Sequence, residues 1–150
     1  MNELTRREEL SLSGAALRGA PWKAAAVTGA AVAAANYVMG VILPGPADLT
    51  RALVVGIGLF TLMAAIGAVS RPDKGDRVTR QARAWSLRHP WRFALYPAAG
   101  AAVLMYPVQL IFDREGVFGA AWDALWGGAM VYVIAGFLTM MNRGRAASAR

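Results

Sequence analysis

The chain has 150 residues, of which 57% are hydrophobic, and it carries a formal net charge of +7. This length predicts a single domain and leaves no room for a separate catalytic domain. The mean hydropathy of +0.39 is higher than that of ordinary soluble domains, in which about half of the residues are apolar. Composition therefore indicates an integral membrane protein. Because the chain contains no cysteine, disulfides, thiolate metal sites and thiol redox chemistry are excluded.

Four apolar segments approach the length that crosses a bilayer. About 20 helical residues span a hydrocarbon core of roughly 30 Å. None of the four segments contains Lys, Arg, Glu or His, and Asp123 is the only acid among them. They therefore lack the polar face that a soluble helix shows at helical spacing. We predict four transmembrane helices, at residues 24–43, 52–69, 93–112 and 117–141.

The first apolar segment also has features of a signal peptide. A basic start is followed by an Ala-rich run and by Ala33-Ala34-Ala35, which is typical of a cleavage site. Against cleavage, the apolar run continues to Leu43, and the leader that precedes it is unusually long for a signal peptide. We expect this segment to be the first transmembrane helix.

Positive charge is distributed unevenly among the segments outside these helices. Fourteen of the 16 Lys and Arg residues lie in residues 1–23, 70–92 and 142–150, and the other two are Arg51 and Arg114. The positive-inside rule then places both termini and the central loop in the cytoplasm. Arginine outnumbers lysine strongly in this Ala-rich chain, as in high-GC bacterial genomes, so we expect the bacterial inner membrane.

An offset of 69 residues aligns the two halves of the chain. The offset pairs a Pro-Trp-basic tripeptide and two glycines of each half: Pro21-Trp22-Lys23 with Pro90-Trp91-Arg92, Gly58 with Gly127, and Gly67 with Gly136. The alternative is that Trp and a basic residue mark any cytoplasmic helix entry. A true duplication predicts two tandem two-helix hairpins, at residues 24–69 and 93–141, related by an axis along the membrane normal.

Small residues at four-residue spacing indicate where the helices touch, because close backbone approach and dispersion hold helices together in lipid. Gly29 and Ala33 in the first predicted helix are one such pair. The expected fold is an all-α integral membrane protein whose two hairpins pack as a four-helix bundle, with a short amphipathic cytoplasmic helix between them. Pro97 and Pro107 predict kinks in the third helix, which we interpret as tolerated packing features rather than as a gate.

An ionisable residue inside a membrane helix is a candidate for function, because it costs about 2.5–3.5 kcal/mol at mid-bilayer. Asp123 is the only one in the predicted helices, about two turns from the outer end of the fourth helix. We favour an interfacial carboxylate that stays hydrated or pairs with Arg51 or Arg114. The alternative is the cation or proton site of a small transporter.

Four uncharged residues lie toward the same outer half of the membrane as Asp123. Amides in lipid usually bond to a neighbouring helix and contribute about 0.6 to 2 kcal/mol, so we favour a packing role for them. The alternative is an outward-facing polar vestibule. The candidate intramembrane polar site consists of Asn36, Tyr37, Tyr106, Gln109 and Asp123.

The basic loop at residues 70–92 contains a predicted amphipathic helix over residues 76–87. Val78, Ala82 and Trp85 form its apolar stripe, which favours a helix lying on the membrane surface with Trp85 in the headgroup region. Topology accounts for the positive charge, so nucleic-acid binding is not expected. The residues expected to bind anionic lipid headgroups or to dock a partner are Arg77, Arg80, Arg83, Trp85, Arg88, Trp91 and Arg92.

The chain lacks the residues of common catalytic and cofactor sites. Its only histidine, His89, lies in the basic loop, where an interfacial role is favoured over a catalytic one. The predicted helices offer one aspartate as a metal ligand, and there is no glycine-rich phosphate loop. We expect no enzyme activity, cofactor or metal. The expected role is a non-catalytic subunit or accessory protein that contacts itself or a larger membrane protein; the alternative is a minimal oligomeric transporter or channel for a small solute or ion.

Overall fold

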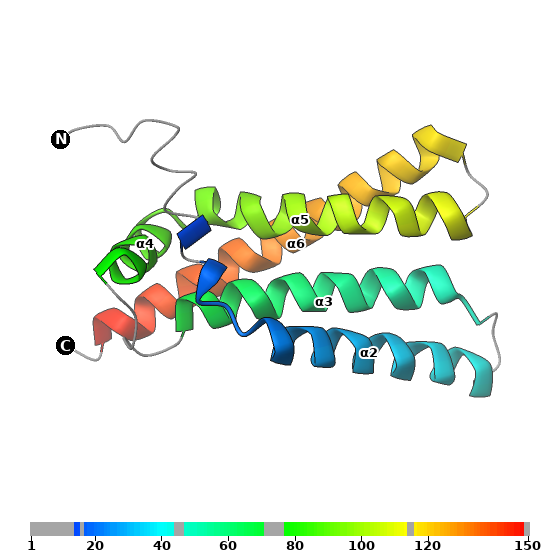
Figure 1. Ribbon diagram of the computed structural model, residues 1–150, viewed down its shortest axis with the longest axis horizontal. Helices are drawn as coiled ribbons and strands as arrows, with labels where there is room; N and C mark the ends of the chain where they lie inside the picture. Colours follow the sequence, from blue (N-terminus) through cyan, green and yellow to red (C-terminus); the bar gives the residue numbers. More distant parts are fainter. Residues whose placement is uncertain (1–13, 16, 44–46, 71–76, 114–115, 149–150) are drawn as a thin grey trace.

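The protein is all-helical in a computed structural model, which describes residues 14–15, 17–43, 47–70, 77–113 and 116–148. Four long helices, at the places of the four predicted spans, are long and apolar enough to cross a membrane, and the described residues contain no strand. Figure 1 shows them side by side, with a shorter helix near one end. The helices whose bounds lie within the described residues are α2 (Trp22–Ile42), α3 (Leu49–Ser70), α4 (Arg77–Arg88), α5 (Pro90–Phe112) and α6 (Gly116–Ser148).

The helices extend beyond the apolar segments that predict them. α5 begins at Pro90, whose fixed φ suits the first turn of a helix and whose missing N–H is not needed there. It continues through Pro97 and Pro107, so neither proline ends the helix. α6 has 33 residues, about 50 Å at 1.5 Å per residue, and is therefore longer than a hydrocarbon core of roughly 30 Å. The apolar segment predicts only the part of a helix that lies in the membrane. The helical backbone hydrogen bonds continue into the polar residues on either side, so the helices are longer than these segments.

The long helices pack as two antiparallel pairs that are joined through α3. α2 packs along α3, α5 packs along α6, and α3 contacts both α5 and α6. Among the described helices, α2 has no comparable contact with α5 or α6. Only Ala25 and Gly29 of its 21 residues are buried, so α2 lies at the edge of the molecule.

The two pairs are close at the end that carries α4 and separate toward the other end. We call these the α4 end and the distal end. In Figure 1 the distal ends of α5 and α6 diverge from those of α2 and α3. Asp48 caps α3 at the distal end, where its Oδ1 accepts a hydrogen bond of 2.9 Å from the backbone N–H of Arg51.

Small residues lie where the helices come closest, as expected from their spacing. A methyl group added to Gly128 of α6 would lie 3.0 Å from the Ala98 carbonyl oxygen and 3.0 Å from the Ala102 Cβ on α5. One added to Gly127 would lie 2.5 Å from the Met105 Sδ. Met105 is itself buried, in a cluster with Ala101, Ala124 and Val131. The core of the α5–α6 pair therefore consists mostly of small side chains that pack around the side chain of Met105.

Candidate functional site

The five residues of the candidate intramembrane polar site do not share one lining. Asn36 and Tyr37 are exposed on α2, whose packing partner is α3. Tyr106 and Gln109 lie on α5, and Asp123 on α6, which pack against each other. The structure thus keeps the last three on one helix pair and places the two α2 residues apart from them. The position of each residue along its helix predicts its depth in the bilayer. It does not predict toward which neighbouring helix the side chain points.

Gln109 is the most buried of these polar residues. Its side chain is 5% exposed, and within the described part of the chain its Oε1 has no hydrogen-bond partner. Leaving a buried acceptor unpaired costs about 1–3 kcal/mol. Tyr106 packs against the cluster of Met105 and Ala124. The Oε1 of Gln109 therefore does not form the interhelical hydrogen bond that a packing role predicts within the described residues.

The possible ion pair between Arg51 and Asp123 is not among the contacts of the described residues, which leaves the hydrated carboxylate as the other prediction for Asp123. Arg51 is exposed and Asp123 is partly buried, and neither side chain has an ion pair in the described part of the chain. Their helices begin at the distal end, where the two helix pairs diverge in Figure 1. Both residues lie near the same side of the membrane and thus at a similar depth. Their helix ends are nevertheless apart. The second expected partner, Arg114, lies outside the described residues.

The helix of the basic loop runs from Arg77 to Arg88, close to the expected bounds of 76–87. Its Trp85 is 6% exposed and lies in a cluster with Val69, Ala82 and Phe93, so protein covers the ring that was expected to face lipid headgroups. The indole Nε1 has no hydrogen-bond partner among the described residues. Ala82 and Trp85 of the expected apolar stripe are both buried, but periodicity does not tell whether lipid or protein covers such a stripe.

Arg83 faces the protein rather than the lipid. Its Nε donates a hydrogen bond of 2.5 Å to the carbonyl oxygen of Val69, in the last turn of α3. A cation at the carbonyl end of a helix also opposes the negative end of the helix dipole. Next to it, the Asn142 Nδ2 donates to the Ser70 Oγ at 3.1 Å, which links α6 to the end of α3. These contacts fix the α4 end of the molecule.

The other residues expected at the headgroups remain at the surface. Arg77, Arg80, Arg88 and Arg92 are exposed. Trp91 is 37% exposed, and its ring packs on α6 against Tyr132 and Phe137, with ring centroids 5.5 and 5.6 Å away. Side-chain surroundings of Val78, the first member of the expected apolar stripe, lie outside the described residues. The basic loop therefore divides into an inward face that packs and an outward face that carries charge.

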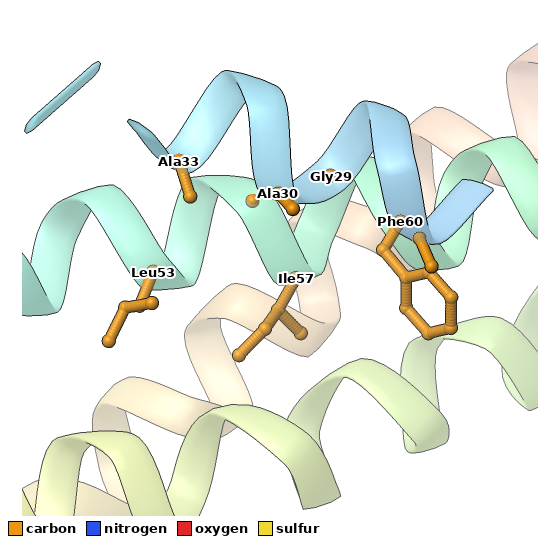
Figure 2. Close-up of a pocket in the computed structure, with 8 residues that line it drawn as sticks. Gly29, Ala30, Ala33, Leu53, Ile57 and Phe60 are labelled. Carbon is orange, nitrogen blue, oxygen red and sulfur yellow. The ribbon is translucent and has the colours of Figure 1, made fainter. Parts of the chain in front are cut away.

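A lateral groove between α2 and α3 was not foreseen from the sequence. It encloses about 260 Å³, and Figure 2 shows the small residues of α2 beside larger side chains of α3. The spacing of Gly29 and Ala33 predicts a helix contact, and both residues do meet Gly56 of α3, but Ala30 beside them is exposed. The lining consists of Ala26, Gly29, Ala30, Ala33, Leu53, Gly56, Ile57 and Phe60.

Within the described residues, no group of three or more His, Cys, Asp and Glu side chains is placed to hold a metal ion. The His89 ring packs near the Trp85 ring, with centroids 5.8 Å apart. Comparison with protein-family models, with curated proteins and with solved structures finds no match to this chain.

Proposed function

We propose that the protein is a small, non-catalytic subunit or accessory protein of a membrane complex, and that it associates through the groove between α2 and α3. The groove carries the proposal. It is lined almost entirely by apolar atoms, it opens on the side of the molecule, and it adjoins the helix with the fewest buried residues. In lipid, helices associate through close packing of such small-residue faces, because no hydrophobic force acts between them.

A second copy of the chain is favoured as the neighbour by an aromatic ridge on α6. Trp122 and Trp126 are 63% and 57% exposed, and their rings stack edge to face at 6.3 Å. Leu53 is about 6 Å along α3 and Trp122 about 9 Å along α6 from the distal ends of these helices, at 1.5 Å per residue. Copies inserted in the same direction therefore carry ridge and groove at a similar depth. A larger membrane protein with an equivalent bulky ridge is the other candidate partner.

We also propose that α2–α3 and α5–α6 are tandem hairpins of one duplicated unit, packed as a bundle through α3. Two contacts at similar places in the two pairs support this, and their glycines, Gly67 and Gly136, are 69 residues apart. Pro21 lies against Gly67 in the first pair, so closely that a Cβ at Gly67 would collide with its ring. Trp91 lies against Gly136 in the second pair, where an added Cβ would lie 2.5 Å from the ring. Both contacts join the start of the first helix of a pair to the second helix.

The proposed location is the bacterial inner membrane, with both termini and α4 in the cytoplasm. The concentration of Lys and Arg in residues 1–23, 70–92 and 142–150 supports this orientation. Trp22 and Trp91 support it as well, since both are partly exposed at the starts of their helices, where membrane interfaces favour tryptophan.

Site-specific photocrosslinking tests the groove. A photoreactive amino acid at Ala30, which lines the groove, is expected to yield adducts with a second copy or with one larger membrane protein after irradiation in cells. The same amino acid at Ala31, which is exposed on α2 but outside the groove, is the matched control and should yield lipid adducts. Mass spectrometry identifies the adducts. Lipid adducts alone at both positions would contradict the proposal.

The second candidate function, a minimal oligomeric transporter or channel, is supported by one observation. Gln109 is buried with an unpaired Oε1 on the helix pair that also carries Asp123. Unsatisfied polar groups at membrane depth are otherwise costly, and they often mark substrate or proton paths. A transport assay with an Asp123 variant separates this function from the first.

A further inference from the structure

The outward face of α4 carries three arginines without an acidic residue. Arg77, Arg80 and Arg88 are exposed, and the sequence of α4, RVTRQARAWSLR, contains no Asp or Glu. At about 100° per residue, their positions fall within roughly 80° of one another around the helix. They therefore form one stripe of positive charge, which we call the arginine face.

The inward face of α4 holds this stripe in place. Ala82 and Ser86 are fully buried, and Trp85 is 6% exposed in the cluster with Val69 and Phe93. Arg83 adds its hydrogen bond to the Val69 carbonyl. Because the apolar side of α4 is already covered by protein, the helix cannot insert that side into the bilayer as a free amphipathic helix does. The arginine face is held by packing instead.

The arginine face lies next to the level at which the transmembrane helices begin. Only His89 separates Arg88 from Pro90, where α5 starts. Trp91, partly exposed in the first turn of α5, is of the type that marks a membrane interface. Arg88 is therefore close to the depth of lipid phosphates, and α4 lies near the ends of the long helices in Figure 1.

We infer that the arginine face of α4 binds the phosphate groups of anionic phospholipids, and that Trp85 is a positioning residue for this site. Arginine matches phosphate oxygens with two parallel N–H donors and keeps its charge at any physiological pH. Charge complementarity selects the ligand, since three guanidinium groups on a helix that itself carries no acidic residue favour an anionic headgroup over a zwitterionic one. Because α4 is a packed helix, the spacing between its three arginines is defined, whereas a mobile basic loop would not hold them at a defined spacing.

Lipid titration of the purified full-length protein tests the inference. The protein in detergent, freed of native lipid, is titrated with dioleoyl-phosphatidylglycerol, dioleoyl-phosphatidylcholine or inorganic phosphate, and native mass spectrometry measures bound lipid. The wild type should prefer phosphatidylglycerol. The triple variant R77Q/R80Q/R88Q should lose this preference by about a hundredfold, the value expected for three basic residues at a charged membrane surface.

A second triple variant, R18Q/K23Q/R143Q, is the matched control. It removes the same charge from exposed residues outside α4 and should keep most of the preference. Equal losses in the two triple variants would overturn the site in favour of overall charge. If inorganic phosphate displaces phosphatidylglycerol at an equal concentration, the site binds free phosphate, and the lipid is overturned as the ligand. No preference in the wild type would overturn the inference too and leave an acidic protein surface as the ligand.

Two Trp85 variants test the positioning role. Trp85→Ala keeps all three arginines but removes the anchor, so it should weaken phosphatidylglycerol binding at least fivefold. Trp85→Phe keeps an aromatic ring in the cluster and should retain binding, which controls for loss of folding in the alanine variant. Full preference in Trp85→Ala would show that the arginines bind without a fixed helix and would remove Trp85 from the site.

Discussion

Gly29 of α2 and Gly56 of α3 lie so close that a methyl group on either would stand 2.7 Å from the carbonyl oxygen of the other. The contact is between backbones, so neither side can move away by changing a side-chain rotamer. Each glycine weakens its own helix by about 1 kcal/mol relative to alanine. The close approach of α2 to α3 offsets this cost, and it is the main attachment of a helix with only two buried residues.

Gly29→Ala is expected to destabilise the protein despite the better helix propensity of alanine. Overpacking against backbone typically costs 1–3 kcal/mol, and we expect a net loss of about 1 kcal/mol. The matched control is Gly100→Ala in α5, where no atom lies within 4 Å of the added Cβ. That variant should be neutral or slightly more stable. Thermal unfolding in detergent measures both, and equal midpoints for the two variants would contradict the contact.

The four spans follow from the sequence because an apolar run of 20 residues has few other uses. The position of α2 at the edge does not follow, because a face that meets lipid and a face that meets another helix are both apolar. Polarity contrast, which orients a helix in a soluble protein, is absent between Ala25, which is buried, and Val27, which is 70% exposed. The same ambiguity hid the groove: Gly29 and Ala33 meet α3 as their spacing predicts, but the spacing does not show that Ala30 beside them stays exposed.

Trp85 illustrates the same limit outside the spans. Helical periodicity identifies its stripe, but a covering by lipid and a covering by α3 and α5 leave the same pattern in sequence. The hydrogen bond from Arg83 to Val69 likewise cannot be predicted from a local pattern, since the two residues are 14 positions apart in the sequence. Charge counting therefore groups Arg83 with Arg77 and Arg80, although Arg83 is partly buried against Val69 and the other two are exposed.

Arg83→Gln should loosen α4, whereas Arg80→Gln should not. Arg83 caps the last turn of α3, and a charged hydrogen bond of this kind that is partly exposed contributes about 1 kcal/mol. Hydrogen exchange of the α4 amides, followed by mass spectrometry, should become about fivefold faster in Arg83→Gln. Arg80 is the matched control because it lies one turn earlier on the same helix and is exposed. An equal acceleration in both variants would indicate a general charge effect.

Gln109→Met should leave stability unchanged or raise it. Methionine has a similar length and removes the buried Oε1 that has no partner in the described structure, so the cost of about 1–3 kcal/mol for an unpaired acceptor disappears. Gln109→Glu keeps the shape but buries an ionisable group, and it should lower the unfolding midpoint. Thermal unfolding in the same detergent measures the pair. A clear loss of stability in Gln109→Met would mean that the amide has a partner, such as bound water, that holds the distal end together.

Asp123→Asn decides between the two proposed functions. A transporter that uses this carboxylate to bind a cation or proton should lose flux at least tenfold in proteoliposomes, because the amide keeps the shape but neither ionises nor carries charge. An accessory subunit should show no flux in the wild type and none in the variant, with an unchanged photocrosslink at Ala30.

Tyr106→Phe serves as the second variant on the same helix pair, since it removes one hydroxyl and keeps the ring that packs on Met105 and Ala124. We propose the subunit first, because Asn36 and Tyr37 lie on α2, which packs on α3, and so do not join Asp123 on the α5–α6 pair.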